Sequence, residues 1–311
     1  MMQQAQLPIA IVMVRPASFG FNPETASTIL FQREPTETSR RDIERRARIE
    51  FDMLAGRLRE AGVEIILVED VEELHTPDAV FPNNWVSFHH DGTVVLYPML
   101  APSRRPERRR DIIEKLQSGG FRVSNMVDLT HHENQGRFLE GTGSVVFDHV
   151  AKRAYACISP RTSPEVLNEL CGILGYKSVT FRAVHENGDG ILHTDMTMSI
   201  GDRFVIFCPD SIPDAAERKL VVESLRTTDR EIITIDRKQV AQFAANVLQL
   251  QAGQGRSVLA ISTSAWLIFR PDQREAIEKY VKIVESPLPL FERIGGGSAR
   301  CMMADVHLPR R

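Results

Sequence analysis

A single cysteine follows three consecutive glycines near the end of the chain. Gly295-Gly296-Gly297 precedes Cys301, and the segment over 299–307 has the pattern of a strand. Glycines lack the Cβ restriction on φ and ψ, so the backbone can turn sharply or let a ligand approach closely. A thiol placed at the start of a strand by such a turn is a candidate nucleophile. A buried structural cysteine is the commoner role of a lone Cys, so this interpretation depends on partners elsewhere in the chain.

His193 and Asp195 are the first candidate partners. A thiol nucleophile needs a base that promotes its thiolate, and the base needs an orienting carboxylate. A free thiol titrates near ~8.5, so a neighbouring imidazolium matters. Two positions apart on a predicted strand, these side chains would face the same side. The pair would also fit a hydrogen-bonded strand end or half of a metal site, but no second histidine stands at a familiar ligand spacing, and the sequence predicts no metal.

Two further stretches carry polar residues next to predicted strands. In the segment 137–143, Glu140 follows two apolar residues and precedes Gly141, which suggests a carboxylate where backbone and ligand come close. A turn with a surface glutamate is the alternative. Asn83 and Asn84 follow Phe81-Pro82, and such amides either cap a turn or bind a planar, neutral polar group through their donors and acceptor.

The elements that would position these residues repeat along the chain. A β-hairpin, a helix and a strand are predicted in the first unit over 85–89 with 93–97, 106–117 and 121–129, and the hairpin-then-helix order recurs three times. The later units are expected over 144–183, 197–235 and 247–284, the last ending in a helix over 272–284.

The beginning of the chain holds only part of such a unit. A strand over 9–14, a helix over 40–60 and a strand over 63–68 lack one hairpin partner, which the terminal strand over 299–307 would supply. Five ββαβ units spaced roughly 50–60 residues apart would form a closed ring, and we expect one catalytic domain over 1–311. An ordinary α+β sheet with similar hairpins by chance is the alternative.

Composition narrows the functional classes. With 42% hydrophobic and 25% charged residues among 311, the chain has an ordinary globular composition. A net charge of −3 gives no electrostatic footprint for nucleic acid. Cys157, Cys171 and Cys208 are expected as free core thiols of a reducing cytosol. No apolar run approaches the roughly 18 residues of a membrane helix, and no signal peptide is recognised, so a cytoplasmic protein is predicted.

Taken together, four motifs resemble the guanidino-group-modifying enzymes, the pentein superfamily. They are Phe81–Asn84, Leu139-Glu140-Gly141, His193-Thr194-Asp195 and Gly295–Cys301-Met302, in that order. The superfamily includes arginine deiminases, dimethylarginine dimethylaminohydrolases, succinylarginine dihydrolases and amidinotransferases. The nearest likeness is to bacterial citrulline-utilisation hydrolases, which are often labelled amidinotransferase-like.

The resemblance implies a fold and a set of roles. The fold is a five-bladed α/β propeller of ββαβ repeats with pseudo-fivefold symmetry. The reaction needs no metal or organic cofactor, and the partner is a small amino-acid substrate, with no nucleic acid and no membrane; a homo-oligomer is left open. The implied residues are Cys301 as nucleophile, His193 as general acid/base, Glu140 at the histidine or the substrate, and Asp195, Asn84, Asn83, Phe81 and Arg137 as substrate contacts.

One departure bears on the substrate. In arginine deiminases the first motif resembles F-T-R-D, and its final aspartate binds the cationic guanidinium. This chain has Asn84 at that position. A charge-assisted hydrogen bond is roughly twice as strong as a neutral one, so losing the carboxylate favours a neutral ureido group. Succinylarginine dihydrolases, which process a ureido intermediate, also have asparagine there. We therefore expect citrulline as substrate, with ornithine, ammonia and CO2 as products.

Other functions stay open on the sequence alone. Arginine deiminase or dimethylarginine hydrolase is one alternative, and an amidinotransferase with an amine acceptor is another. A non-catalytic propeller that acts as a binding module, like the ribosome anti-association factor, would lack the aligned Cys, His and Glu. Arg15, Arg137 and Arg300 are candidates to grip a substrate carboxylate, with surface or structural roles as the alternative for each.

Overall fold

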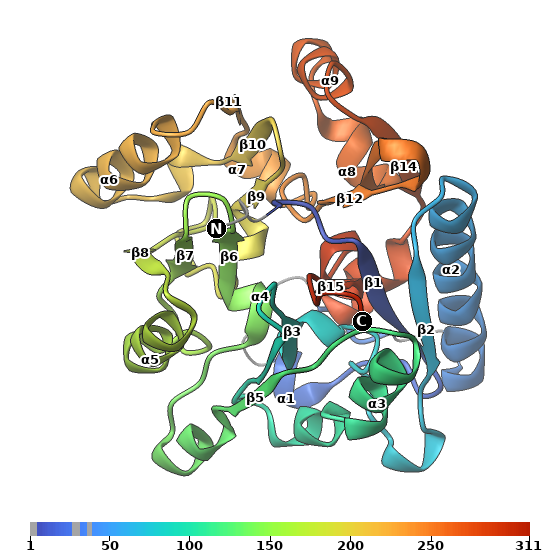
Figure 1. The fold of residues 1–311 in the computed structure, drawn as a ribbon. Coiled ribbons are helices and arrows are strands. Elements are labelled where there is room, and N and C mark those ends of the chain that lie inside the picture. Colours follow the sequence, from blue (N-terminus) through green and yellow to red (C-terminus); the bar gives the residue numbers. More distant parts are fainter. Residues whose placement is uncertain (1–4, 27–31, 36–38) are drawn as a thin grey trace.

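A ββαβ order recurs along the chain in the computed structural model, which describes residues 5–26, 32–35 and 39–311 (Figure 1). In each unit the first two strands are antiparallel, and the strand after the helix lies parallel to the second. The first two units are β3 (Val86–Phe88), β4 (Thr93–Leu96), α3 (Arg110–Ser118) and β5 (Asn125–Asp128), then β6 (Val145–Asp148), β7 (Arg153–Cys157), α5 (Pro164–Leu174) and β8 (Lys177–Phe181). The next two are β9 (Met198–Ile200), β10 (Phe204–Phe207), α6 (Ala215–Arg226) and β11 (Glu231–Thr234), then β12 (Leu248–Gln251), β13 (Ser257–Ser262), α8 (Thr263–Ile268), α9 (Pro271–Glu278) and β14 (Lys282–Ser286).

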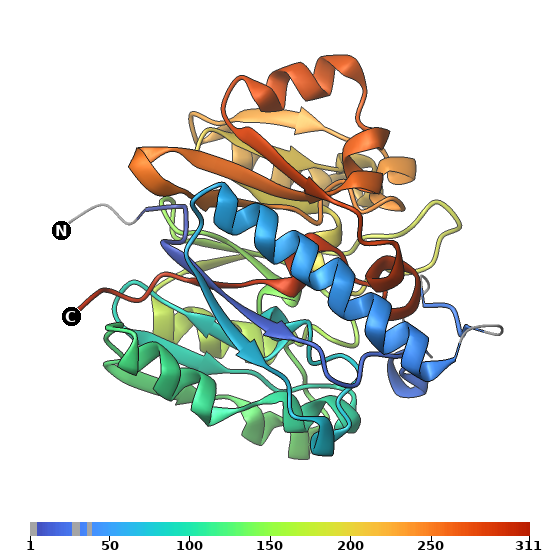
Figure 2. The ribbon, with the colours of Figure 1, turned by 90° about the vertical axis from the view of Figure 1, so that its right-hand side faces the viewer.

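The two ends of the chain build the fifth unit together. Its elements are β15 (Ala304–Val306), β1 (Ala10–Arg15), α2 (Arg40–Glu60) and β2 (Ile65–Glu69). Strand β15 pairs antiparallel with β1, with Asp305 opposite Ile11, and β1 pairs parallel with β2. The prediction that the terminal strand completes the N-terminal unit is therefore confirmed. Figure 2 shows α2 crossing this side of the molecule.

Sheet pairing itself does not close into a ring. Strand β15 also pairs with β3 through Val306 and Phe88, so two units share the six-stranded sheet β2-β1-β15-β3-β4-β5. Within the described residues the other three units are separate three-stranded sheets. The first strands of neighbouring units still lie close together, since β9 contacts both β6 and β12. The five helices α2, α3, α5, α6 and α9 lie around the outside (Figure 1).

Local sequence signals explain where the helices begin and end. The carboxylate of Asp214 accepts hydrogen bonds from the first free N–H groups of α6, at 2.8 Å each. Pro164 occupies the first turn of α5, where its missing N–H costs nothing. Gly175 ends that helix at φ 70°, in the left-handed region that glycine tolerates. The predicted bounds of α2 and α5 are confirmed.

Two predicted helices were wrong in extent. The helix expected over 272–284 ends at Glu278, and β14 follows, because β-branched Ile283 and Val284 pair beside β13 and bury Val284. The helix expected from Pro106 starts at Arg110, after a 3₁₀ segment over Pro102–Glu107. Proline cannot donate the backbone bond that would continue an α-helix through that point.

Several site residues lie on short turns that were expected to be strand. Asp195 belongs to a 3₁₀ turn (Thr194–Met196), and Cys301 belongs to another (Ala299–Met302). Their side chains are thus aimed by turns rather than by strand alternation. The remaining short helices are α1 (Pro23–Ala26), α4 (Gly141–Ser144) and α7 (Arg237–Val240).

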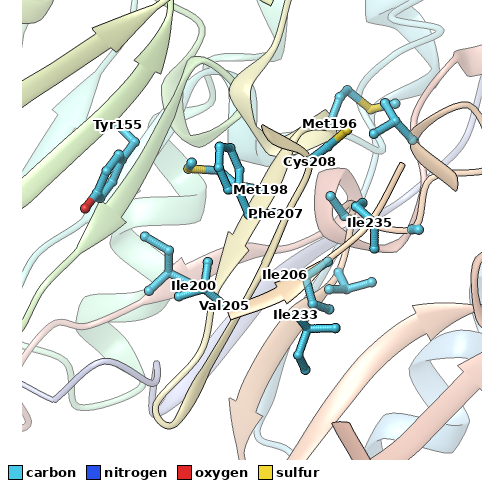
Figure 3. Packing of buried hydrophobic residues seen from close by; sticks show 14 of the residues in the cluster. Tyr155, Met196, Met198, Ile200, Val205, Ile206, Phe207, Cys208, Ile233 and Ile235 are labelled. Atoms are coloured by element: carbon cyan, nitrogen blue, oxygen red, sulfur yellow. The ribbon is translucent and has the colours of Figure 1, made fainter. Parts of the chain in front are cut away.

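Apolar packing beneath these turns fixes their position. Figure 3 shows one cluster, in which Met198, Ile206 and Ile233 come from β9, β10 and β11. Met196, which belongs to the turn that carries Asp195, is part of the same cluster and anchors that turn to it. Cys157 and Cys208 also belong to this cluster, as free buried thiols. Among the described residues, no helix is both long enough and apolar enough to cross a membrane.

Candidate active site

The candidate site forms where the five units begin. Each segment that leads into the first strand of a unit contributes a polar side chain, or backbone that packs against the other segments. These segments contact one another. Their contributions are Asn83 and Asn84 before β3, Glu140 and α4 before β6, His193 and Asp195 before β9, Asn246 before β12, and Cys301 before β15.

Cys301 is buried, with its thiol among polar side chains from two other units. Its Sγ lies 3.2 Å from Asn246 Nδ2 and 3.5 Å from Asp195 Oδ2, to which the S–H can donate. Burial, together with the negative charge of Asp195, raises the pKa of the Cys301 thiol far above its usual range. In the free protein the thiol is therefore protonated.

His193 is held by a buried ion pair. Its Nε2 donates to Glu140 Oε2 over 2.8 Å, and the same carboxylate accepts from Arg161 Nη1 at 2.8 and 3.1 Å. Burial by itself would raise the pKa of Glu140, but the charge of Arg161 and the contact with His193 lower it well below its usual range. An ionised Glu140 fixes the tautomer, so that Nδ1 of His193 is free to exchange protons with a substrate.

Asn84 is oriented by a buried arginine. Arg104 Nη1 donates to Asn84 Oδ1 at 2.9 Å, and Arg104 also pairs with Glu107 at 2.9 Å. Because arginine has only donors, this contact assigns the oxygen and nitrogen of the amide. The Nδ2 of Asn84 is buried with no hydrogen-bond partner among the described residues. Asn84 therefore offers a donor, and its neighbour Asn83 donates to Asp195 Oδ2 at 3.4 Å.

Glycines keep space open beside these side chains. A methyl group on Gly143 would lie 2.5 Å from Asn84 Nδ2 and 3.3 Å from His193 Nδ1, so both atoms border the same glycine. On the other side, the ring of Phe81 packs against the glycine run, where a methyl group on Gly297 would be 2.9 Å from Phe81 and 3.2 Å from Cys301 Cβ. The glycine run thus permits the close approach of the aromatic ring to the loop that carries Cys301.

The arginines expected at a substrate carboxylate lie in different surroundings. Arg300 is buried and binds Met303 O and Asp305, and Arg15 pairs with Asp52 and Glu69. Arg137 stands three residues before Glu140 and is exposed. Its role in substrate binding stays a prediction.

Three residues of the site were missed from the sequence: Asn246, Arg161 and Arg104. Asn246 stands two residues before β12, as Asn84 stands two before β3, so the repeat itself carries a signal for it. No local pattern marks Arg161 or Arg104, because each reaches its partner across more than 15 residues of chain.

A match to a protein-family model identifies the family of this chain. The model described as N,N dimethylarginine dimethylhydrolase, eukaryotic, matches residues 15–308. The chain belongs to this family. The predicted likeness to the pentein superfamily is confirmed, and so is the prediction of a hydrolase acting on C–N bonds. No curated protein matches the sequence.

Solved structures of the superfamily share the fold. The N-terminal domain of ArgZ, an arginine dihydrolase of cyanobacteria, superposes with a TM-score of 0.71 at 19% identity, covering 96% of this chain and 98% of that one. AgrE, solved as a complex with L-arginine, gives 0.72 at 19%, covering 97% of this chain and 41% of that one. A dimethylarginine dimethylaminohydrolase, solved as an adduct with S-methyl-L-thiocitrulline, gives 0.64 at 18%, covering 96% and 99%.

Proposed function

We propose that this member of the family is a cysteine-dependent hydrolase of the terminal ureido or guanidino group of a small amino acid, with citrulline as its preferred substrate. Cys301 is the nucleophile, His193 the general acid and base, and Glu140 the group that orients His193. The finer description of the fold belongs to the same proposal: one catalytic domain over 1–311, whose five ββαβ units form a five-bladed propeller. Contacts between the first strands of neighbouring units support it.

The observation that carries the choice of substrate is the hydrogen bond from Arg104 to Asn84 Oδ1. It leaves Asn84 Nδ2 as the atom presented to a ligand, and Nδ2 is a donor. The ureido group of citrulline has a carbonyl oxygen that accepts from it, whereas every nitrogen of a guanidinium is a donor. Leaving a buried donor unpaired costs about 1–3 kcal/mol, which favours the ureido group.

The reaction follows from these positions. The thiol proton passes to Asp195 Oδ2, which lies 3.5 Å away, and Sγ attacks the ureido carbon. His193 enters the cycle as the imidazolium. The bond from the ureido carbon to the side-chain nitrogen breaks, and His193 Nδ1 protonates the leaving nitrogen to release ornithine. The S-carbamoyl group on Cys301 is then attacked by water, whose proton returns His193 to the imidazolium. The carbamic acid released breaks down to ammonia and CO2, and Asp195 returns its proton to the Cys301 thiolate.

A second candidate substrate is arginine, favoured by one observation of its own. Asp195 places a buried carboxylate beside Sγ, and a guanidinium bound there would compensate its charge. The family description names dimethylarginine, and ArgZ is an arginine dihydrolase. With arginine, the nitrogen released would be ammonia and the product citrulline.

The test is a comparison of products from citrulline, arginine and dimethylarginine offered separately to the purified protein. We expect ornithine and ammonia from citrulline, and none from a Cys301→Ala variant. Asn84→Asp is the matched variant, since its carboxylate still accepts from Arg104 and adds a charge. It should raise the ratio of kcat/KM for arginine over citrulline by about tenfold. A wild type that turns over arginine faster than citrulline would overturn the substrate preference, and a folded protein inactive on all three would overturn the hydrolase.

A further inference from the structure

A second cluster of reactive side chains lies at the other end of the strands that carry the site. His149 follows β6 and His307 follows β15, whereas Glu140 and Cys301 precede those same strands. His90 follows β3 in the same way. Ala5, the first described residue, also lies at this end, where its carbonyl oxygen accepts a hydrogen bond from His90 Nε2 at 2.9 Å. The histidines therefore gather beyond the ends of β3, β6 and β15, opposite to Cys301.

The cluster is compact and buried. The His149 and His307 rings lie 4.1 Å apart between centroids, and the His90 ring lies 4.6 Å from His307. His149 and His307 are each only 4% exposed. One ligand atom each from His149, Asp305 and His307 lie within 4.8 Å of one another.

His307 has no satisfactory hydrogen bond for either ring nitrogen among the described residues. Its Nε2 stands 3.4 Å from Asp305 Oδ2, within ion-pair range but without hydrogen-bond geometry. Buried polar atoms are rarely left this way, because each costs about 1–3 kcal/mol of stability. A ring nitrogen that is buried, faces a carboxylate and a second imidazole, and lacks a partner is explained by a ligand that accepts its lone pair.

We propose that His149, Asp305 and His307 form a binding site for a divalent transition metal ion, with Zn²⁺ as the ion it fits best. The site is separate from Cys301 and does not depend on the proposed reaction.

The spacing suits tetrahedral coordination. Zinc lies about 2.0–2.1 Å from nitrogen and oxygen ligands, so neighbouring ligand atoms stand about 3.3 Å apart. The distance of 3.4 Å from His307 Nε2 to Asp305 Oδ2 already matches that value. Two imidazoles and one carboxylate leave a fourth position for water, and this donor set favours zinc over magnesium or calcium, which take mainly oxygen ligands.

The surroundings orient the ligands as metal sites require. His149 Nδ1 is engaged with Tyr176 OH at 2.8 Å, which leaves Nε2 of His149 for the ion. Asp305 accepts from Arg300 through Oδ1 at 2.9 Å and keeps Oδ2 for the ion. Such outer contacts fix the tautomer and the direction of each ligand. A cavity of about 30 Å³, lined by His149 and Asp305, lies beside them and has room for a coordinated water.

The experiment uses the full chain in a Cys301→Ala background, so that zinc cannot bind the active-site thiol. Metal-free protein is titrated with Zn²⁺ against a chromophoric chelator, and His149→Gln and His307→Gln are compared with it. His131→Gln is the matched control, because His131 belongs to another group of possible ligands, with His132 and Glu169, and is exposed. We expect one tight equivalent of Zn²⁺, weakened at least about 100-fold by either cluster variant and unchanged in the control.

Co²⁺ provides a second readout of which atoms bind. Visible bands of four-coordinate Co²⁺ without a thiolate charge-transfer band would support the site. A thiolate charge-transfer band would overturn it, because it would locate the ion at a cysteine. Equal Zn²⁺ affinity in the parent and both cluster variants, loss of binding in His131→Gln, or no tight equivalent in the parent would each overturn the proposal. If one cluster variant fails to fold, the other decides.

Discussion

Replacing Asp195 with asparagine should make the Cys301 thiol more reactive while it slows turnover. The carboxylate of Asp195 lies 3.5 Å from Sγ, and its negative charge raises the pKa of the thiol. Asparagine keeps the shape of the side chain and an oxygen that can accept from Asn83, which donates to Asp195 Oδ2 at 3.4 Å. The substitution therefore removes charge with little change in packing.

The size of the effect follows from the distance. Two unit charges 3.5 Å apart interact by about 4–5 kcal/mol at an effective dielectric constant of ~20. One pKa unit corresponds to about 1.4 kcal/mol, so a fully ionised Asp195 would raise the pKa of the Cys301 thiol by about three units. Burial also raises the pKa of Asp195 itself, and a less ionised Asp195 would give a smaller shift. We therefore expect Asp195→Asn to lower the pKa of the Cys301 thiol by between about one and three units.

The assay is alkylation by iodoacetamide in the absence of substrate, because the thiolate is the reacting form. At a fixed pH near 9 the rate at Cys301, followed by mass spectrometry, should rise at least tenfold in Asp195→Asn. Asp229→Asn, which removes an exposed carboxylate, should leave the rate unchanged. Turnover should fall in Asp195→Asn, because the proposed acceptor of the thiol proton is lost. An unchanged or slower alkylation rate would refute the assignment of Asp195 as the charge that controls the thiol.

Three further outcomes follow from buried charges. Glu140→Gln should lower kcat by about 10²–10⁴-fold with the fold retained by circular dichroism, because His193 loses the carboxylate that orients it; near-normal kcat would contradict the role of Glu140. Arg161→Met should lower the free energy of unfolding in urea by about 3–5 kcal/mol, since it leaves the carboxylate of Glu140 buried without its cation; a change under about 1 kcal/mol would contradict it. Burial raises the pKa of Glu50 to about 7, although it accepts from Leu290 N at 3.0 Å. The folded state then holds a proton that the unfolded chain has released, so unfolding free energy falls as pH rises from about 4.5 to about 7. Glu50→Gln should flatten that slope and stabilise the protein at pH 8 by about 1–3 kcal/mol, measured by urea titration at several pH values; parallel curves would contradict this.

The repeat made most of the fold predictable. Hairpin strands such as β12 and β13 stood out because segments rich in apolar residues flank a glycine turn, and the helix α5 because Pro164 and Gly175 mark its ends. The strand β14 was missed because the five residues from Lys282 follow a helix with no proline or glycine between them. Only pairing with β13 shows that they are extended.

The site was predictable to the same degree and for a similar reason. Cys301, His193, Glu140 and Asn84 were selected because each stands in a motif that leads into a predicted strand, and Glu140 also directly precedes a glycine. The turns that aim Asp195 and Cys301 were not predicted, since a 3₁₀ turn of three or four residues has no periodicity to detect. The buried cations Arg104 and Arg161 reach their partners from other parts of a unit, and only the folded chain brings them together.

The two ends of β15 link the thiol to the histidine cluster. Cys301 lies on the turn before this strand and Asp305 within it, and Arg300 spans the distance by donating to Asp305 Oδ1 at 2.9 Å and to Met303 O at 2.8 Å. The backbone N–H of Arg300 also donates to Asn246 O at 3.2 Å, next to the amide that contacts Sγ. An ion held by Asp305 would therefore fix the same arginine that anchors the turn carrying Cys301. A displaced turn would move Sγ away from Asn246 and Asp195. Binding of an ion at Asp305 should therefore change the reactivity of Cys301 before any other property of the site.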